Sequence, residues 1–249
     1  MIMIFKGIQY ESLIEWPGKI CTVVFVAGCN FRCPYCHNRD LVLAPEKLPD
    51  VGEREILKYL RENRNLLDGL MITGGEPLRG RTFKDLIEFI KKVKNIGLKV
   101  GIETNGSFPE AILALLGCDS QKNLRKGRIP TIDYIAMDIK TALREKKYEK
   151  AAGVKVCPDK IKKSIDIIMN SGLDYEFKTT VIPGIVSEED ILEIARGLKG
   201  VKKYVLQQFQ PKNTLDKKFE KVKPYPKEWF EKVAENLKKY LTNVELRIY

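Results

Sequence analysis

Three cysteines within eight residues are the side chains of this sequence that most directly predict chemistry. Three residues separate Cys29 from Cys33, and two separate Cys33 from Cys36. Thiolates this close together can bind one compact metal centre, and soft sulfur ligands select iron–sulfur clusters, zinc or copper(I). Three thiolates on a cluster of about four irons leave one iron open, which suits a catalytic site better than a structural one.

Two other interpretations of this loop are open on the residues alone. A structural zinc site normally closes with four protein ligands, and His37, the only histidine of the chain, follows Cys36 directly. Neighbouring residues rarely both reach one tetrahedral ion without strain, so zinc is less favoured than a cluster. The remaining alternative is three unrelated core cysteines, and it is the least favoured.

The length of the chain and its cysteine content limit the classes of protein to which it can belong. The 249 residues are enough for a single domain over residues 1–249. No apolar stretch is long enough to span a membrane, and the first residues lack the charged lead and cleavage site of a signal peptide. The six cysteines are therefore expected to be reduced thiols or metal ligands in a cytoplasmic protein.

The cysteines outside the loop lie in settings that do not predict ligands. Cys21 belongs to a nearly unbroken apolar run and is expected in the core. Cys118 lies in a polar stretch with no partner at metal spacing, and Cys157 precedes Pro158, where it marks an expected helix start. A second cluster is therefore not expected.

The net charge of +11 allows several kinds of partner. Such a balance can indicate nucleic acid or an acidic protein, or only the Lys- and Glu-rich surface that thermophiles favour. The basic residues are scattered, mostly in pairs, and do not form one run with interleaved aromatics. A solvated surface is the favoured interpretation, an acidic protein partner the second and nucleic acid the last.

Apolar periodicity predicts strands and helices in alternation. The strands are expected over residues 19–27, 69–73, 98–103, 133–139, 175–182, 201–209 and 244–249. The helices are expected over residues 53–66, 82–96, 109–116, 158–171, 187–198 and 227–241, with Ser187 and Asp190 as a capping signal. This order predicts a parallel βα architecture, although an open or closed doubly wound sheet would give the same pattern. Residues 117–131 form a polar connection that is long for a compact barrel.

Polar residues gather where the expected strands end, which is where βα barrels place their active sites. Gly74 and Gly75 permit close backbone approach, and Glu76 offers a negative charge to an ammonium group. Glu103 can accept two hydrogen bonds from a ribose diol. Asp138 and Lys140 point to the same side of one strand, as a functional pair or as a structural salt bridge. With the cysteine loop, Lys178 and the run Gln207–Gln210, six strand ends converge on one rim, and this convergence predicts a binding site more strongly than any single motif.

The cysteine spacing also carries a resemblance to a known family. The CxxxCxxC pattern, with Tyr35 before its last cysteine, resembles the cluster-binding loop of radical S-adenosylmethionine (SAM) enzymes. The wider run from Trp16-Pro17-Gly18 to Cys36-His37-Asn38 resembles glycyl-radical-enzyme activases, most closely those of anaerobic ribonucleoside-triphosphate reductase. The resemblance extends in patches from about residue 12 to about residue 211. It implies an α/β fold with a partial (βα)6 barrel, open on one side to admit a macromolecular substrate.

The resemblance also implies cofactors and residue roles. A 4Fe-4S cluster is expected on Cys29, Cys33 and Cys36, with SAM beside it and Asp138 and Lys140 near the reacting groups. Lys178 stands where the family usually has an Arg that binds the methionine carboxylate, and Lys lacks the bidentate fork of Arg. The residues expected to bind SAM are Tyr35, Gly74, Gly75, Glu76, Glu103, Asn105, Lys178 and Gln210.

The implied reaction is reductive cleavage of SAM to a 5′-deoxyadenosyl radical, which takes a hydrogen atom from a glycine. The implied partners are the reductase and an electron donor such as ferredoxin or flavodoxin. No membrane is expected, and nucleic acid is the least favoured partner. The alternatives are an activase of another glycyl-radical enzyme, a radical SAM enzyme acting on a small molecule such as a deazapurine precursor, and a non-enzymatic zinc module. The Trp-Pro-Gly and Cys-His-Asn flanks favour the reductase activase.

Overall fold

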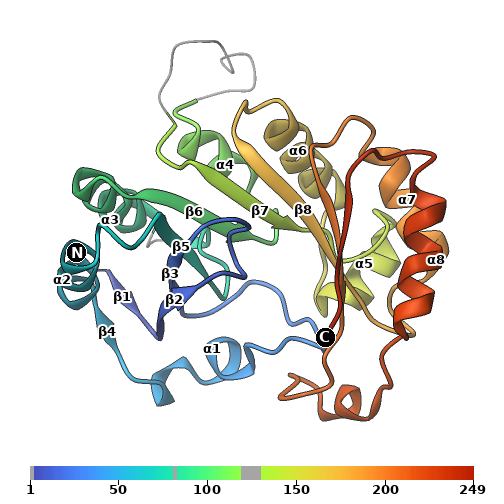
Figure 1. The fold of residues 1–249 in the computed structure, drawn as a ribbon. Helices are drawn as coiled ribbons and strands as arrows, with labels where there is room; N and C mark the ends of the chain where they lie inside the picture. The colour runs from blue at the N-terminus through green and yellow to red at the C-terminus, as the bar shows by residue number, and fades with distance from the viewer. Residues whose placement is uncertain (1–2, 81–82, 119–129) are drawn as a thin grey trace.

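The computed structural model describes residues 3–80, 83–118 and 130–249, and its centre is one curved, mostly parallel sheet (Figure 1). The strands of this sheet lie in the order β10-β9-β8-β7-β6-β5-β3-β2. Six of them run parallel in chain order: β3 (Cys21–Val26), β5 (Gly69–Gly74), β6 (Lys99–Thr104), β7 (Tyr134–Asp138), β8 (Asp174–Val181) and β9 (Tyr204–Gln208). They are the predicted strands of the partial (βα)6 barrel.

Helices pack on the outer face of this sheet, as the alternation predicts. The main ones are α2 (Glu53–Glu62), α3 (Phe83–Ile96), α4 (Pro109–Leu115), α6 (Pro158–Met169), α7 (Glu188–Gly197) and α8 (Lys227–Leu237). The capping box predicted from Ser187 and Asp190 is confirmed, since each side chain accepts a hydrogen bond from the other residue's backbone N–H. Cys157 and Pro158 mark the start of α6 as predicted, with Cys157 at the N-cap.

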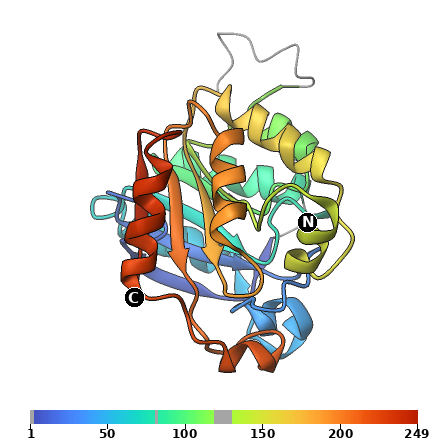
Figure 2. The same cartoon turned by 90° about the vertical axis from the view of Figure 1, so that its right-hand side faces the viewer.

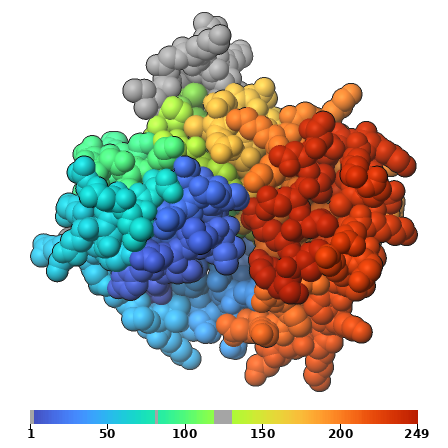
Figure 3. All heavy atoms as spheres, viewed as in Figure 1, coloured from blue at the N-terminus to red at the C-terminus, as the bar shows by residue number. Residues whose placement is uncertain are grey.

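The two edges of the sheet do not meet within the described residues. At one edge β2 (Ile8–Ser12) runs antiparallel to β3, and at the other β10 (Val244–Arg247) runs parallel to β9. A separate two-stranded ribbon joins β1 (Ile4–Phe5) to β4 (Val51–Gly52). Figure 1 shows both edges of the large sheet on the same face of the molecule, and in Figure 3 the blue N-terminal and red C-terminal parts of the chain meet the viewer on that face. The barrel is therefore open, as expected.

Several helix boundaries differ from the sequence expectation for local reasons. The helix expected over 53–66 ends at Glu62, where Asn63 leaves the helical conformation and caps the helix with a side-chain hydrogen bond to the Tyr59 carbonyl. A helix not predicted from the sequence, α5 (Glu145–Ala152), lies between β7 and α6, and only Tyr148 and two alanines of it are buried. A short helix, α1 (Arg39–Leu43), follows the cysteine loop. Most of the expected polar connection, residues 119–129, lies outside the described residues.

Trp16 closes the amino-terminal end of the barrel from within. Its ring stacks on Tyr134 with centroids 5.0 Å apart and 15° between the planes. A Cβ on Gly69 or Gly101 would come within 3.0–3.1 Å of this ring, so the two glycines make room for it. Cys21 is fully buried in the same cluster, which confirms its expected place in the core. Trp16 of the Trp-Pro-Gly run thus has a packing role.

The main apolar core lies between the outer face of the sheet and the helices. Phe89 of α3, Phe177 of β8 and Phe230 of α8 are fully buried there. In the parts of the chain that the structure describes, no helix has the length and apolar character needed to cross a bilayer. The inner face of the barrel is apolar only near Trp16 and becomes polar toward the carboxyl ends of the strands.

Candidate active site

The carboxyl ends of the parallel strands surround a cavity of about 220 Å³. Ten of the residues predicted from the sequence line it: Cys29, Cys33, Tyr35, Cys36, Gly74, Gly75, Glu103, Asn105, Asp138 and Lys140. Three others predicted to bind SAM, namely Glu76, Lys178 and Gln210, are not among the lining residues. On β9 the lining residue is Gln207, which pairs in register with the lining residue Thr180 of β8.

The cysteine loop is folded by its own backbone and by burial. The Phe31 N–H donates to Cys29 Sγ at 3.3 Å, and the Cys36 N–H donates to the Cys33 carbonyl at 3.0 Å. Burial raises the pKa of the Cys33 thiol to about 12 and also raises the pKa values of Cys29 and Cys36. The thiols therefore keep their protons until a metal displaces them.

The cavity wall fits a cluster with a polar ligand beside it. All three thiols face one cavity, so each can bind a separate iron of a multinuclear cluster. Among residues 3–80, 83–118 and 130–249 no three His, Cys, Asp or Glu side chains are placed to hold a single metal ion. The buried Tyr35 hydroxyl has no hydrogen-bond partner within the described part of the chain, and a polar ligand in the cavity would satisfy it.

Gly74 and Gly75 bring the turn after β5 against the cysteine loop. The Gly75 N–H donates to the Val26 carbonyl and the Glu76 N–H to the Gly28 carbonyl, both at 2.9 Å. A Cβ on Gly75 would lie 1.7 Å from the Gly28 oxygen. Asn38 Nδ2 adds a bond of 2.8 Å to the Gly74 carbonyl. The close backbone approach expected for a ligand is thus also an approach between two segments of the protein.

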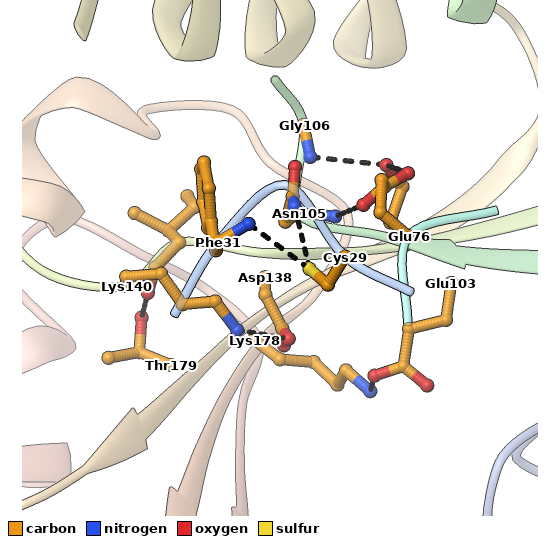
Figure 4. Close-up of polar contacts among 12 residues, drawn as sticks. Cys29, Phe31, Glu76, Glu103, Asn105, Gly106, Asp138, Lys140, Lys178 and Thr179 are labelled. Carbon is orange, nitrogen blue, oxygen red and sulfur yellow. Dashed lines mark hydrogen bonds and ion pairs between the residues drawn. The ribbon is translucent and has the colours of Figure 1, made fainter. Parts of the chain in front are cut away.

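Glu76 is buried behind the cavity wall, where it holds the turn after β6 (Figure 4). Its carboxylate accepts hydrogen bonds from Thr104 Oγ1 and the Asn105 N–H at 2.7 Å, and from the Leu78 N–H at 3.1 Å. Burial raises the pKa of Glu76 to about 7 in spite of these three donors. The contact of Glu76 with a ligand ammonium stays a prediction, whereas its hold on Asn105 is present in the structure.

Glu103 and Lys178 form an ion pair inside the barrel. The other carboxylate oxygen of Glu103 accepts a hydrogen bond of 2.9 Å from Thr73 Oγ1. Lys178 is only 7% exposed; burial acts to lower its pKa, but Glu103 and Asp138 outweigh that effect and raise it. Glu103 reaches the cavity and Lys178 does not. In this arrangement Lys178 holds the Glu103 carboxylate, and its contact with the methionine carboxylate stays a prediction.

Asp138 and Lys140 form a charged pair on the cavity wall, with Lys140 Nζ 2.7 Å from the Asp138 carboxylate. Burial acts to raise the pKa of Asp138, but the charges of Lys140 and Lys178 outweigh it and hold that pKa below its ordinary value. Asp138 likewise holds the pKa of Lys140 well above its ordinary value against the effect of burial. The salt bridge considered as an alternative is thus present, and it faces the cavity.

Sequence reasoning missed a hydrogen-bonded triangle that joins the cysteine loop to the turn after β6. Asn105 Nδ2 donates to Asn30 Oδ1 at 3.0 Å, and Asn30 Nδ2 donates to Ser107 Oγ at 2.9 Å. Ser107 Oγ donates to Asn105 Oδ1 at 2.6 Å. The available signal was the position of Asn30 directly after Cys29, since an amide there can reach across to a neighbouring strand end.

Comparison with known proteins assigns the chain. The model of the radical SAM superfamily matches residues 23–198. This chain belongs to the radical SAM superfamily. Membership makes it an enzyme of the radical SAM type and implies an iron–sulfur cluster and SAM as its cofactors, which the donor set of the cavity fits.

Three curated relatives differ in how much of the radical SAM chain they cover. A candidate glycyl-radical enzyme activating enzyme of Methanocaldococcus jannaschii is 34% identical, over 99% of this chain and 97% of the relative. The pyruvate formate-lyase-activating enzyme of Clostridium pasteurianum is 28% identical, over 87% of this chain and 85% of the relative. The anaerobic ribonucleoside-triphosphate reductase-activating protein of Pasteurella multocida is 35% identical, but over only 35% of this chain and 58% of the relative.

A solved structure shares the fold. Streptococcus suis SuiB, bound to the precursor peptide SuiA, superposes with a TM-score of 0.64 at 17% identity, over 91% of this chain and 48% of that one. This likeness concerns the fold alone.

Proposed function

We propose that this protein is an activase that generates a glycyl radical on a partner enzyme, with anaerobic ribonucleoside-triphosphate reductase as the partner. The observation that carries the proposal is the placement of three thiols and a charged pair on one cavity of an open sheet. The full-length similarity to a candidate activating enzyme supports the activase class. The reductase is supported by the loop flanks and by a relative that matches about a third of the chain (35%).

The residues of the cavity divide into those that would hold the cluster and those that would hold SAM. Cys29, Cys33 and Cys36 would bind three irons of a four-iron cluster, one thiolate for each iron. When bound, the reduced cluster and SAM supply a 5′-deoxyadenosyl radical. Lys140 and Asp138 present opposite charges to the cavity, which suits the carboxylate and ammonium of an amino acid moiety. Tyr35 offers a hydroxyl that has no hydrogen-bond partner among the described residues.

A glycine of a macromolecule suits this site for a chemical and a structural reason. The radical left on a glycine Cα is delocalised over the two flanking amides, so this C–H bond is a favourable target. The sheet stays open between β2 and β10 in the described residues, and a protein loop needs such an opening more than a metabolite does. The electron required for each cleavage would come from a small protein such as ferredoxin or flavodoxin.

Electron paramagnetic resonance tests the proposal. The reconstituted, reduced protein is mixed anaerobically with SAM and the anaerobic reductase of the same genome. We expect a glycine-centred doublet that disappears when the radical-bearing glycine of the reductase is changed to alanine, or when Cys33→Ala removes a cluster ligand. A protein that leaves every glycyl-radical enzyme of its host without a radical, yet transforms a deazapurine precursor, would show that the small-molecule alternative is right.

A further inference from the structure

A lysine-rich segment, residues 210–223, is bound to the outer side of the cysteine loop. The Leu215 N–H donates to the Cys36 carbonyl at 3.1 Å, and the Asp216 N–H donates to the Pro34 carbonyl at 2.8 Å. Thr214 between β9 and these contacts is fully buried. The short 3-10 helix η4 (Lys217–Lys221) follows, and Figure 2 shows it in red-orange, with α1 in blue, on the side toward which β8 and β9 point. The segment is thus fixed to the backbone between the cluster ligands.

This segment concentrates positive charge. It contains five lysines against two acidic residues, Asp216 and Glu220. None of the five lysines forms an ion pair within the part of the chain that the structure describes, whereas Lys91, Lys94 and Lys163 elsewhere each pair with a carboxylate. Asp216 uses its carboxylate to accept from the Lys218 N–H at 3.0 Å. The five lysines, all exposed, are Lys212, Lys217, Lys218, Lys221 and Lys223.

Beside the lysines lies a shallow hollow of about 240 Å³ with an apolar floor. Pro183, Ile185, Phe219 and Val222 form the floor, and Lys150 and Lys218 flank it. Lys150 Nζ is held over the edge by a hydrogen bond of 2.9 Å to the Gly184 carbonyl. An apolar centre with a charged rim is the anatomy of a protein–protein interface, and a small one fits a transient redox encounter.

The floor of the hollow also contacts the wall of the cluster cavity. The ring of Phe219 lies 6.3 Å from the ring of Tyr35, measured between centroids. Tyr35 stands between Cys33 and Cys36 in the loop and lines the cavity. Two contacting rings therefore separate the hollow from the space that the cluster would fill. Because electron transfer weakens steeply with distance, a donor seated on this hollow is well placed to reduce the cluster.

We propose that the lysine-rich segment and the hollow beside it form the docking site for a small acidic protein that donates one electron to the cluster. The inference rests on the cluster of the proposed function and not on the identity of the glycyl-radical partner. The donor, an iron–sulfur or flavin protein, is oxidised by one electron and the cluster is reduced by one. No bond of this chain is made or broken at the surface. The basic rim would act mainly on the association rate.

Charge reversal with a matched control tests the docking site. The test variant is Lys217→Glu/Lys218→Glu/Lys221→Glu. The control, Lys99→Glu/Lys199→Glu/Lys239→Glu, reverses three exposed lysines that lie at the start of β6 or shortly before β9 and β10, and therefore at the opposite end of the barrel. Stopped-flow absorbance follows reduction of the reconstituted cluster by a reduced acidic ferredoxin or flavodoxin at low salt, and by photoreduced deazaflavin, a small donor.

For the test variant we expect the rate constant with the protein donor to fall about tenfold or more, while the control changes less than about twofold. Both variants should react normally with deazaflavin, and added salt should shrink the difference. Surface plasmon resonance with the oxidised donor should show the same loss of affinity, independently of turnover.

Three results would overturn the docking site. The first is reduction of the test variant by the protein donor at the wild-type rate. The second is normal reduction combined with loss of glycyl-radical formation after chemical pre-reduction, which would assign the surface to the glycyl-radical partner. The third is an unchanged reduction rate combined with lost binding of an RNA or DNA oligonucleotide. If the test variant alone is reduced slowly but no glycyl radical forms even in the wild type, the docking site holds and only the proposed function fails.

Discussion

At the scale of single residues, the polar side chains of the site fall into an inner set that faces the cavity and an outer set that supports it. Asp138 and Lys140 belong to the inner set, while Glu76 and Lys178 belong to the outer one. The residue types could be predicted from the sequence because all four lie in or just after the carboxyl-terminal half of an apolar strand. How deeply each side chain lies behind the cavity wall could not be predicted. That depth depends on how far each strand extends beside its neighbours and on which partner a charged side chain pairs with.

The Glu103–Lys178 pair predicts how the site responds to loss of one charge. In Lys178→Met, the partly buried Glu103 carboxylate loses its charged partner, and we expect a loss of about 1–3 kcal/mol in the free energy of unfolding. The double variant Lys178→Met/Glu103→Gln removes both charges and should recover most of that stability. Urea unfolding of wild type, Lys178→Met, Glu103→Gln and the double variant measures the coupling energy between the two side chains. Additive losses in the double variant would show that the pair does not act as a unit.

The same variants separate support of the site from contact with SAM. If Glu103 binds the ribose and Lys178 only holds it, SAM affinity measured by calorimetry should fall in both single variants by about 1–3 kcal/mol, and the double variant should not recover it. A Lys178→Met protein that binds SAM as tightly as wild type would contradict the supporting role. Recovery of SAM affinity in the double variant would move the ribose contact away from Glu103.

Glu76 predicts a particular pH dependence of stability. Burial raises its pKa to about 7 from the ordinary 4.5, so between these values the folded protein binds more protons than the unfolded chain. The contribution of Glu76 to stability is then fully present below pH 4.5 and is lost as the pH rises to about 7. Its total change is on the order of 3 kcal/mol.

Unfolding of wild type and Glu76→Gln across pH 4–8 checks this sign. The glutamine cannot ionise, so the stability of wild type relative to the variant should fall with increasing pH over that window. Glu62→Gln, which removes an exposed carboxylate, serves as the control and should show no such trend. Parallel profiles for wild type and Glu76→Gln would mean that Glu76 titrates at its ordinary pKa in the folded protein.

At the scale of elements, the cysteine loop is held by the turns that follow the neighbouring strands. The turn after β5 bonds to Val26 and Gly28, and the turn after β6 reaches Asn30 through Asn105. The sequence predicted these turns as ligand-binding motifs, and the structure adds that they also bond to the cysteine loop. It likewise predicted the six strands and the capping box of α7. It did not reveal α5, whose eight residues bury too few apolar side chains to leave a clear period.

Gly75→Ala tests directly whether the turn after β5 holds the cysteine loop in place. The new Cβ would lie 1.7 Å from the Gly28 carbonyl oxygen, and because that atom is backbone the loop itself must move. We expect a loss of about 1–3 kcal/mol or more in stability and a lower iron content after reconstitution. Gly197→Ala is the matched control, since nothing lies within 4 Å of its Cβ and it ends a helix, where alanine stabilises by roughly 0.5–1 kcal/mol.

Thermal unfolding and iron analysis of the two alanine variants give the answer. A Gly75→Ala protein that melts with wild type and binds as much iron would show that the loop and the turn after β5 are independent. A loss of iron in Gly197→Ala would show that the iron content depends on general stability and not on the contact between the cysteine loop and the turn after β5.

At the scale of the whole molecule, the reactive side chains of the open sheet lie at the carboxyl ends of its strands, and a packed aromatic cluster fills the opposite end. Trp16 and Tyr134 fill the amino-terminal end, while the cavity occupies the carboxyl ends. Trp16 of the Trp-Pro-Gly run therefore contributes to packing at the end of the barrel opposite the cavity. The net charge of +11 could be counted from the sequence, but its local excess beside the cysteine loop required the path of the chain after β9.

Deuterium transfer tests the central claim most directly. The anaerobic reductase of the same genome is prepared with glycine deuterated at Cα, and is mixed anaerobically with the reduced protein and SAM. The account predicts one deuterium in the 5′-deoxyadenosine, measured by mass spectrometry, in step with the appearance of the glycyl radical. A 5′-deoxyadenosine that forms at the same rate but carries no deuterium would contradict hydrogen abstraction from the partner's glycine.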